Sequence, residues 1–244
     1  MPDGIAISAW QYRPALDPNV EELGYSAGSF DGRFLLSAFY TAVWGKNSET
    51  NFGLIYQRYR PFRYSYCYNG DANGDGRTAN DLIYIPNTFD EIKNNLLAGS
   101  FGTVEEAWEA MDAFIEQDGY LRKHRGKYAE RNGAIVPFAN QLDFSMYHDI
   151  KIFQNNGRYH TLRFSMDIAN FLNLLNKDWG VSRSTVMGSS GSPQYQFLEV
   201  VRGHNPSEAN NYTVKYTMRK DLSETFRDNF GSYWQMQFGI KYIF

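Results

Sequence analysis

The sequence predicts an all-β fold built from antiparallel strands. Aromatic residues make up 17% of its 244 residues, with 18 Tyr, 18 Phe and 21 Gly, and this balance favours strands and turns over helices. Several segments alternate strictly between apolar and polar side chains, which is typical of strands with one apolar face. Short polar connections join some of these segments, so neighbouring strands are expected to run antiparallel.

The first strands are predicted in the amino-terminal quarter of the chain, where β-branched and aromatic residues are frequent. They cover residues 5–12, 33–44 and 51–64. The connection 45–50 is short and polar, as in a tight turn. Aromatic residues stand near the strand ends and suit the two interfaces of a membrane-spanning sheet: Trp10, Tyr12, Trp44, Tyr56, Tyr59, Tyr64, Tyr66 and Tyr68.

A long connection follows at about 65–141, and its sequence predicts helices. The segment Thr103-Val104-Glu105-Glu106 fits a capping box, and apolar residues at helical spacing follow it. A second, short helix is predicted over 88–97. Structureless loops of this length are rare in compact domains, so we expect the connection to act as a lid or a binding loop.

The clearest alternation lies in the carboxy-terminal half of the chain. Four strands are predicted there, at residues 142–152, 161–168, 212–218 and 234–244. The first two are joined by residues 154–158, whose Asn-Gly pair is a strong hairpin signal. A shorter strand at 195–202 brings the total to about eight. The apolar face of the last strand consists of every second residue: Trp234, Met236, Phe238, Ile240, Tyr242 and Phe244.

Two environments explain a strand with one apolar and one charged face. In a soluble sandwich or barrel, the apolar face points into a dry interior and the charges face water. In a membrane barrel, the apolar face meets lipid and the charges line a polar lumen. Alternation alone does not distinguish them, but the predicted connections are alternately long and short, as in outer-membrane barrels.

Composition and motifs argue against several other functions. The net charge is -3, with 24 Lys and Arg against 27 Asp and Glu, so no strong field attracts nucleic acid. No apolar run approaches the roughly 20 residues of a membrane-spanning helix. The single cysteine, Cys67, cannot form an internal disulfide. The four histidines lack metal-binding spacing, and nucleophile-elbow and phosphate-binding glycine motifs are missing, so we expect no catalytic residues and no enzyme.

One segment has the spacing of a calcium-binding loop. Asp71, Asn73 and Asp75 place oxygen ligands at positions 1, 3 and 5, and Gly76 follows at position 6. An EF-hand needs a bidentate acid at position 12, whereas this chain has Asp81 at position 11 and no flanking helices. Two interpretations stay open: an Asx- and glycine-rich turn, or a structural Ca²⁺ held by Asp71, Asn73, Asp75 and Asp81. No other cofactor is expected.

Several segments together resemble one protein family. They are Tyr68–Gly76 with Asn80–Pro86, Lys123–Gly133, Asn173–Gly180 and Trp234–Phe244. They occur in family order from about residue 30 onward, and the chain ends on an aromatic residue, as bacterial outer-membrane proteins do. In these segments the chain is similar to TonB-dependent outer-membrane transporters of the Bacteroidetes type, particularly the Oar-like barrels.

The resemblance implies a bacterial outer-membrane barrel of about 22 strands with an amino-terminal plug. Because 244 residues are too few for so many strands with their loops, we expect a C-terminal part with about eight strands and an extracellular loop at 65–141. The implied function is energised uptake of a ligand. The implied partners are outer-membrane lipid, the TonB system through a missing N-terminal region, and a surface-exposed ligand-binding protein. The six alternating residues of the last strand would face lipid.

A second hypothesis belongs to a different class of protein. The same strands could form an autonomous eight-stranded or soluble β-barrel that binds a small ligand or sugar inside. The two hypotheses differ in what covers the apolar strand faces, which is lipid in the first and a dry core in the second.

Overall fold

The computed structural model describes residues 13–26, 29, 32–78, 80–155, 158–184, 186–187, 193–204, 212–220, 226–227 and 229–244. The strand predicted at 5–12 lies outside these residues. The fold is mostly β, with 47% strand and 16% helix, and its long strand pairs are all antiparallel. The all-β, antiparallel fold class is therefore confirmed.

The chain divides into two compact units, each assembled from three segments. Unit 1 comprises residues 1–29, 62–136 and 185–226. Unit 2 comprises residues 30–61, 137–184 and 227–244. None of the described helices has the length and apolar character needed to cross a membrane.

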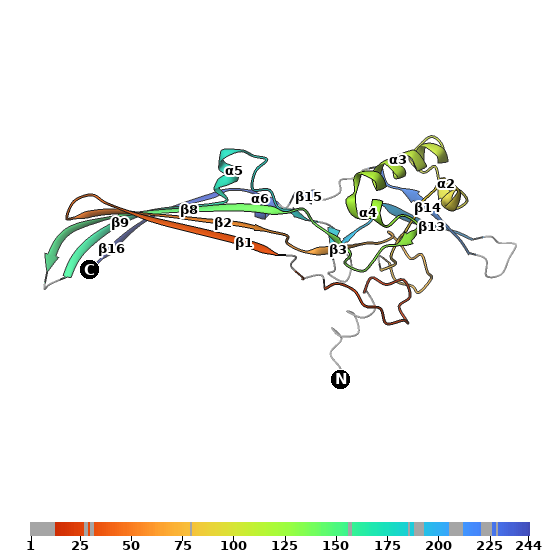
Figure 1. The fold of residues 1–244 in the computed structure, drawn as a ribbon, viewed down its shortest axis with the longest axis horizontal. Helices are drawn as coiled ribbons and strands as arrows, with labels where there is room; N and C mark the ends of the chain where they lie inside the picture. Colours follow the sequence, from red (N-terminus) through yellow and green to blue (C-terminus); the bar gives the residue numbers. More distant parts are fainter. Residues whose placement is uncertain are drawn as a thin grey trace. The chain divides into compact units, whose positions relative to one another are not determined.

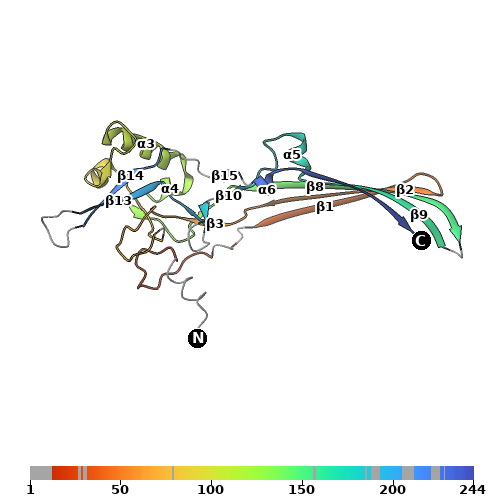
Figure 2. The same cartoon turned by 180° about the vertical axis from the view of Figure 1, so that it is seen from behind.

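Unit 2 is built on a five-stranded sheet with the order β1-β2-β8-β9-β16 (Figures 1 and 2). Its strands are β1 (Arg33–Val43), β2 (Ser48–Tyr59), β8 (Ala139–Asn155), β9 (Arg158–Ala169) and β16 (Gln235–Ile243). They correspond to five predicted strands, with shifted ends. The unit also contains α5 (Phe171–Leu175), β10 (Arg183–Ser184) and α6 (Asn229–Ser232). The short strand β15 (Phe226–Arg227) lies where the sequence passes between the units.

Two tight turns set the register of this sheet. Between β1 and β2 the backbone of Gly45 has φ +78°, a left-handed conformation that glycine adopts without steric cost. Between β8 and β9, Asn155 lies opposite Arg158, so the predicted hairpin is present, although the two residues at its tip lie outside the described ones. Both turns lie where the sequence places its short polar connections.

Unit 1 consists of small sheets and helices. One sheet has the order β11-β12-β3-β7, a second has the order β13-β14-β5, and β4 pairs with β6. Its strands are β3 (Arg63–Tyr66), β4 (Tyr84–Ile85), β5 (Leu96–Leu97), β6 (Lys127–Tyr128), β7 (Ala134–Ile135), β11 (Val186–Met187), β12 (Pro193–Tyr195), β13 (Leu198–His204) and β14 (Tyr212–Met218). Its helices are α2 (Phe89–Ile92), α3 (Val104–Gln117) and α4 (Gly119–Lys123).

The longest helix, α3, starts where the capping box predicts. The Oγ1 of Thr103 accepts the backbone N–H of Glu106 at 3.1 Å, which satisfies one of the free donors of the first turn. The helix buries Ala107, Met111 and Ile115 in the core. The helix predicted at 88–97 is shorter than expected, because α2 ends at Ile92 and residues 96–97 pair with β14 instead.

A core rich in aromatic residues holds unit 1 together. Tyr66 contributes its ring to this core, and its hydroxyl donates a hydrogen bond to Asp118 Oδ2 at 2.8 Å. Tyr64 and Tyr68 are buried in the same core. The expectation that Tyr64, Tyr66 and Tyr68 stand at a membrane interface was therefore wrong, because their side chains pack inside unit 1.

The predicted strands at 195–202 and 212–218 exist, but they do not join the five-stranded sheet. They correspond to β13 and β14, which pair with each other and with β5. The ring of Tyr216 stacks on Tyr68 at 4.7 Å, and Met218 is buried. The expectation of eight strands in one sheet is corrected, because alternating residues pack as well on a protein core as on lipid. Within the described residues, five strands form the long sheet and no closed barrel is present.

Most of the connection predicted at 65–141 is a folded part of unit 1 and does not form an open loop. Residues 62–136 fold with residues 185–226 around the shared core of unit 1. Helix α3 contacts β14 of this unit (Figure 1). The connection is thus part of a folded unit with its own interior.

Candidate functional site

The register of the long sheet gathers apolar residues of all five strands on one side, which we call the apolar face. Two complete rows of paired residues cross it. One row is Ala38, Leu54, Phe144, Ile168 and Met236. The next is Tyr40, Phe52, Met146, Met166 and Phe238. Since side chains alternate between faces, the residues between these rows define the opposite side, which we call the polar face.

The apolar face is exposed. Phe238 and Ile240 on the edge strand β16 are 71% and 73% exposed. Leu54 and Phe164 lie on strands with a neighbour on each side, yet each is still 39% exposed. Their exposure therefore comes from an uncovered face and not from a sheet edge. Helix α5 covers part of one end, where Phe171 contacts Phe144 with ring centroids 5.7 Å apart.

The residues predicted to face lipid are all exposed. Their exposed fractions range from 37% to 80%. Four of them alternate along β16 on the apolar face and two flank that strand: Trp234, Met236, Phe238, Ile240, Tyr242 and Phe244. Their placement agrees with the pattern read from the sequence.

Aromatic rings gather at both ends of the apolar face. At the end with the two tight turns, consecutive ring centroids across β8, β9 and β16 are 4.2, 5.7 and 6.0 Å apart, in the order Phe153, His160, Tyr242 and Phe244. Trp44 follows β1 directly and donates its indole N–H to Thr50 Oγ1, which lies on the apolar face, at 2.8 Å. At the opposite end, Phe34 and Tyr56 meet edge to face at 6.2 Å.

The polar face carries a network of ionised and amide side chains. One row across it consists of Val43, Glu49, Asp149, Arg163 and Lys241. Arg163 and Asp149 form a two-pronged ion pair, with 2.6 Å from Nε to Oδ1 and 2.7 Å from Nη2 to Oδ2. There are exceptions to this pattern, because Leu35, Phe39 and Val43 of β1 and Ile55 of β2 also point to this side and are exposed.

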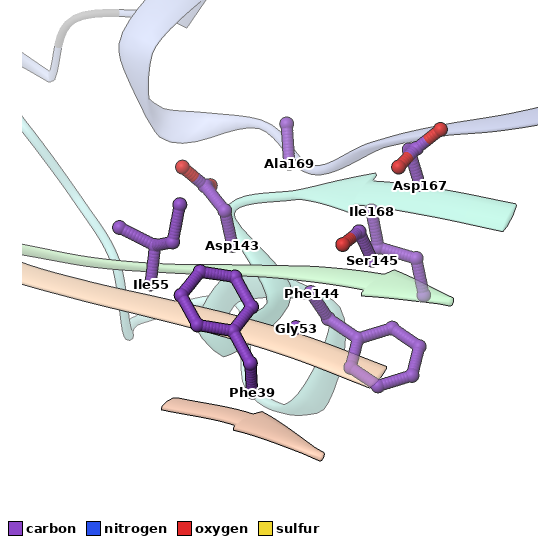
Figure 3. A pocket seen from close by; sticks show the side chains of 9 residues that line it. All are labelled: Phe39, Gly53, Ile55, Asp143, Phe144, Ser145, Asp167, Ile168 and Ala169. Atoms are coloured by element: carbon purple, nitrogen blue, oxygen red, sulfur yellow. The ribbon is translucent and has the colours of Figure 1, made fainter. Parts of the chain in front are cut away.

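A shallow depression of about 270 Å³ lies mainly on the polar face. Figure 3 shows Asp143 and Asp167 on the same side of the strands as Phe39, with Phe144 on the other side. A Cβ atom at Gly53 would come within 3.3 Å of the Phe39 ring and 2.8 Å of Ser145 Oγ, so glycine leaves room for both. The Asp143 carboxylate accepts the N–H of Asn170 at 2.8 Å, which links β8 to the residue before α5.

The candidate calcium loop lies in unit 1, between β3 and β4. Backbone N–H groups of Gly74 and Gly76 donate to the Asp71 carboxylate at 2.6 and 3.0 Å. The Asn73 Oδ1 accepts the N–H of Asp75 at 2.9 Å. Asp81 Oδ2 accepts a backbone N–H of the same loop, from Ala72, at 2.7 Å. All four predicted ligands therefore belong to one hydrogen-bonded loop.

Burial at this loop changes the acidity of two neighbouring groups. Burial raises the pKa of Asp81 to about 6, despite the N–H groups of Ala72 and Asn73 that lower it, and the charges of Asp75 and Asp71 add to the rise. Burial also raises the pKa of the Cys67 thiol, with a contribution from Asp81. In the described part of the chain, no three His, Cys, Asp or Glu side chains stand together as a ready metal site.

One residue of the loop was missed at the sequence level. Asn80 is 2% exposed and donates from Nδ2 to Asp75 Oδ2 at 3.1 Å. Its position next to Asp81 was the only signal for it.

In comparisons of the chain with known proteins, no family, no curated protein and no solved structure matches.

Proposed function

We propose that the chain is part of a TonB-dependent transporter of the bacterial outer membrane, and that unit 2 supplies membrane-spanning strands of its barrel. The observation that carries this proposal is the largely exposed apolar face that all five strands share, which is backed by charged and amide side chains on the other side of the same strands. A contiguous apolar surface of this kind marks an interaction site, and lipid is the occupant that fits a whole sheet.

The dimensions of the sheet support lipid as that occupant. A spanning β-strand needs about 9–11 residues, and β1 and β16 have 11 and 9. Aromatic residues such as Trp44 and Tyr242 at one end, and Tyr56 at the other, suit the two lipid–water interfaces. In a barrel wall the apolar rows would lie between these interfaces.

The polar face would then line the lumen. In cross-strand pairs such as Arg163 with Asp149, the opposite charges compensate each other within the barrel wall. Lys241 on the edge strand lies beside Arg163, where it is available to a neighbouring element of the lumen such as the plug. The plug and the TonB contact come from the family resemblance alone.

The two sheet edges require further strands. In a bilayer, unpaired backbone groups along β1 and β16 would have no water to bond to, so other strands of the barrel must pair with them. Five strands are also fewer than the eight of the smallest outer-membrane barrels. The long connections from β2 to β8 and from β9 to β16 leave the sheet at the ends opposite the tight turns. In outer-membrane barrels long connections are extracellular, so unit 1 would belong to the ligand-capturing surface.

Spin-label accessibility on neighbouring residues tests this proposal. In a Cys67→Ala background, nitroxide labels are attached through the single substitutions Phe238→Cys and Gln237→Cys, and the whole barrel protein that contains this chain is reconstituted in phosphatidylcholine vesicles. We expect the label at 238 to collide with lipid-soluble oxygen and to be shielded from a water-soluble nickel chelate. The label at 237, on the polar face, is the matched control and should not show this preference.

The same experiment distinguishes the soluble alternative. If the label at 238 is immobile and shielded from both reagents, the apolar face is a dry interior and the membrane proposal fails. If the label at 238 prefers the nickel chelate, this face meets water and the proposal fails as well.

A further inference from the structure

The loop from Asp71 to Asp81 contains buried oxygen atoms that no donor satisfies within the described residues. Asp81 is 4% exposed, and its Oδ1 has no hydrogen-bond partner there. Asn80 is 2% exposed, and its Oδ1 has none among the same residues. Buried acceptors are nearly always hydrogen-bonded in folded proteins. Two adjacent exceptions therefore indicate that a further group binds these oxygens.

The side chains of both residues contact the loop through their other polar atoms. The other oxygen of Asp81 accepts backbone N–H groups of Ala72 and Asn73, at 2.7 and 3.3 Å. The amide of Asn80 lies against Asp75, to which its nitrogen donates at 3.1 Å. A buried carboxylate and a buried amide therefore face a loop that itself presents two further carboxylates.

We propose that this loop binds a structural Ca²⁺ ion through side-chain oxygens of Asp71, Asn73, Asp75 and Asp81, with Asn80 as an additional ligand. Carboxylate and amide oxygens are the ligands that hard cations prefer. Ca²⁺ accepts six to eight oxygens in flexible geometry, whereas Mg²⁺ demands a near-ideal octahedron. Among the described residues the carboxylates are not gathered into a ready site, so binding would require the loop to close around the ion, and the flexible coordination of Ca²⁺ suits such a loop better than the strict geometry of Mg²⁺.

The loop is connected to three other parts of unit 1, so the ion would stabilise the unit as a whole. Asp81 forms a β-bridge with Ala15. The N–H of Asn69 donates to Leu198 O at 2.8 Å, which joins the loop entrance to β13. Cys67 forms a bridge with Leu82, directly after the loop. This role does not depend on whether unit 2 lies in a membrane.

Modification of Cys67 gives a direct readout of this site. The thiol is fully buried, so a thiol reagent reaches it only when this part of unit 1 opens. A ligand at about ten times its dissociation constant lowers the open population about tenfold, and calcium sites of extracellular modules have dissociation constants of about 10⁻⁴–10⁻³ M. We therefore expect Ca²⁺ at about 5 mM to slow modification several-fold relative to EGTA, and Mg²⁺ at the same concentration to have little effect.

Charge-neutral variants assign the effect to the loop. Asp75→Asn and Asp81→Asn remove a charge but keep an oxygen, so each should reduce the slowing by Ca²⁺, while Asp90→Asn, the same change on an exposed ion pair of unit 1, should leave it unchanged. Equal modification rates of the unsubstituted protein in Ca²⁺ and EGTA would overturn the proposal without any variant. An unchanged Ca²⁺ effect in Asp81→Asn would also overturn it. Calorimetric titration of the unsubstituted protein with CaCl₂ gives an independent answer if a variant fails to fold.

Discussion

The guanidinium of Arg163 on β9 holds the carboxylate of Asp149 on β8 with two hydrogen bonds, at 2.6 and 2.7 Å, and it also lies over the ring of Tyr147 at 4.1 Å. Asp149 is 8% exposed on the polar face, where exposed side chains such as Phe39 also lie. The Arg163 guanidinium and the Tyr147 ring therefore shield the Asp149 carboxylate from solvent.

Replacing Arg163 should destabilise unit 2. Arg163→Met leaves the largely buried Asp149 carboxylate without its cation, and because the Arg163 side chain is 32% exposed, the expected loss of unfolding free energy is about 1–2 kcal/mol, less than for a fully buried pair. The double variant Arg163→Met with Asp149→Leu should cost less than the sum of the single variants, because no charge is left unpaired. Urea unfolding followed by tryptophan fluorescence measures both. Strictly additive costs would mean that the two side chains are not coupled.

A charged side chain introduced on the apolar face should lower the free energy of unfolding far more than one introduced on the polar face. Phe238→Arg is expected to cost about 2–4 kcal/mol in a bilayer, because the guanidinium must leave water near the membrane centre. Gln237→Arg, one residue away on the polar face, should change stability by less than about 1 kcal/mol. Unfolding in lipid vesicles measures the difference. Equal costs would contradict a lipid-facing position for Phe238.

The first turn of α3 offers a matched test of helix capping in unit 1. Thr103→Ala removes the hydroxyl that accepts the N–H of Glu106 and should cost about 1 kcal/mol. Thr88 holds the equivalent position before α2 but makes no such bond, so Thr88→Ala should be close to neutral. Protection of Cys67 from a thiol reagent reports both effects. A larger loss for Thr88→Ala than for Thr103→Ala would contradict the capping role.

Unit 1 should lose stability in alkaline solution. Burial raises the pKa of Tyr66 and of Tyr68 well above the usual value of 10.0, and it raises that of Tyr120 to about 12. The unfolded chain therefore releases these protons at lower pH than the folded one. The stabilising contribution is complete below pH 10 and is lost as pH rises through about 12.

Absorbance at 295 nm measures this titration, because it reports tyrosinate. We expect a late, cooperative step above pH 10 that coincides with loss of the circular dichroism of unit 1. In urea the late step should disappear, since all tyrosines are then exposed. If every tyrosine of the folded protein titrates near pH 10 with the fold intact, these three rings are not buried as described.

The strands were largely predictable, because their signal is local. The alternation along Gln235–Ile243 and along Arg158–Ala169 follows from the two-residue repeat of a strand, and the helix after Thr103 follows from its capping box. The spacing of Asp71, Asn73 and Asp75 likewise predicted a single loop. These features require only neighbours in sequence.

The partners of each strand were not predictable from the same signal. The residues of β14 alternate like those of β16, yet β14 joins the core of unit 1 while β16 forms the edge of the exposed sheet. Alternation gives each strand an apolar face but does not specify what covers it. The buried, unpartnered oxygens of Asn80 and Asp81 depend on distant segments such as Ala15, so no reading of the loop alone reveals them.

By itself, the sequence determined which segments are extended, which face of each is apolar, and which loop carries the acidic and amide oxygens. Only the tertiary structure decided that five of the strands share one uncovered apolar face, and that the long connections fold into a unit of their own. The physical reason is that backbone conformation is set by local side-chain patterns, whereas burial is set by residues that are distant in sequence and meet only in the folded chain.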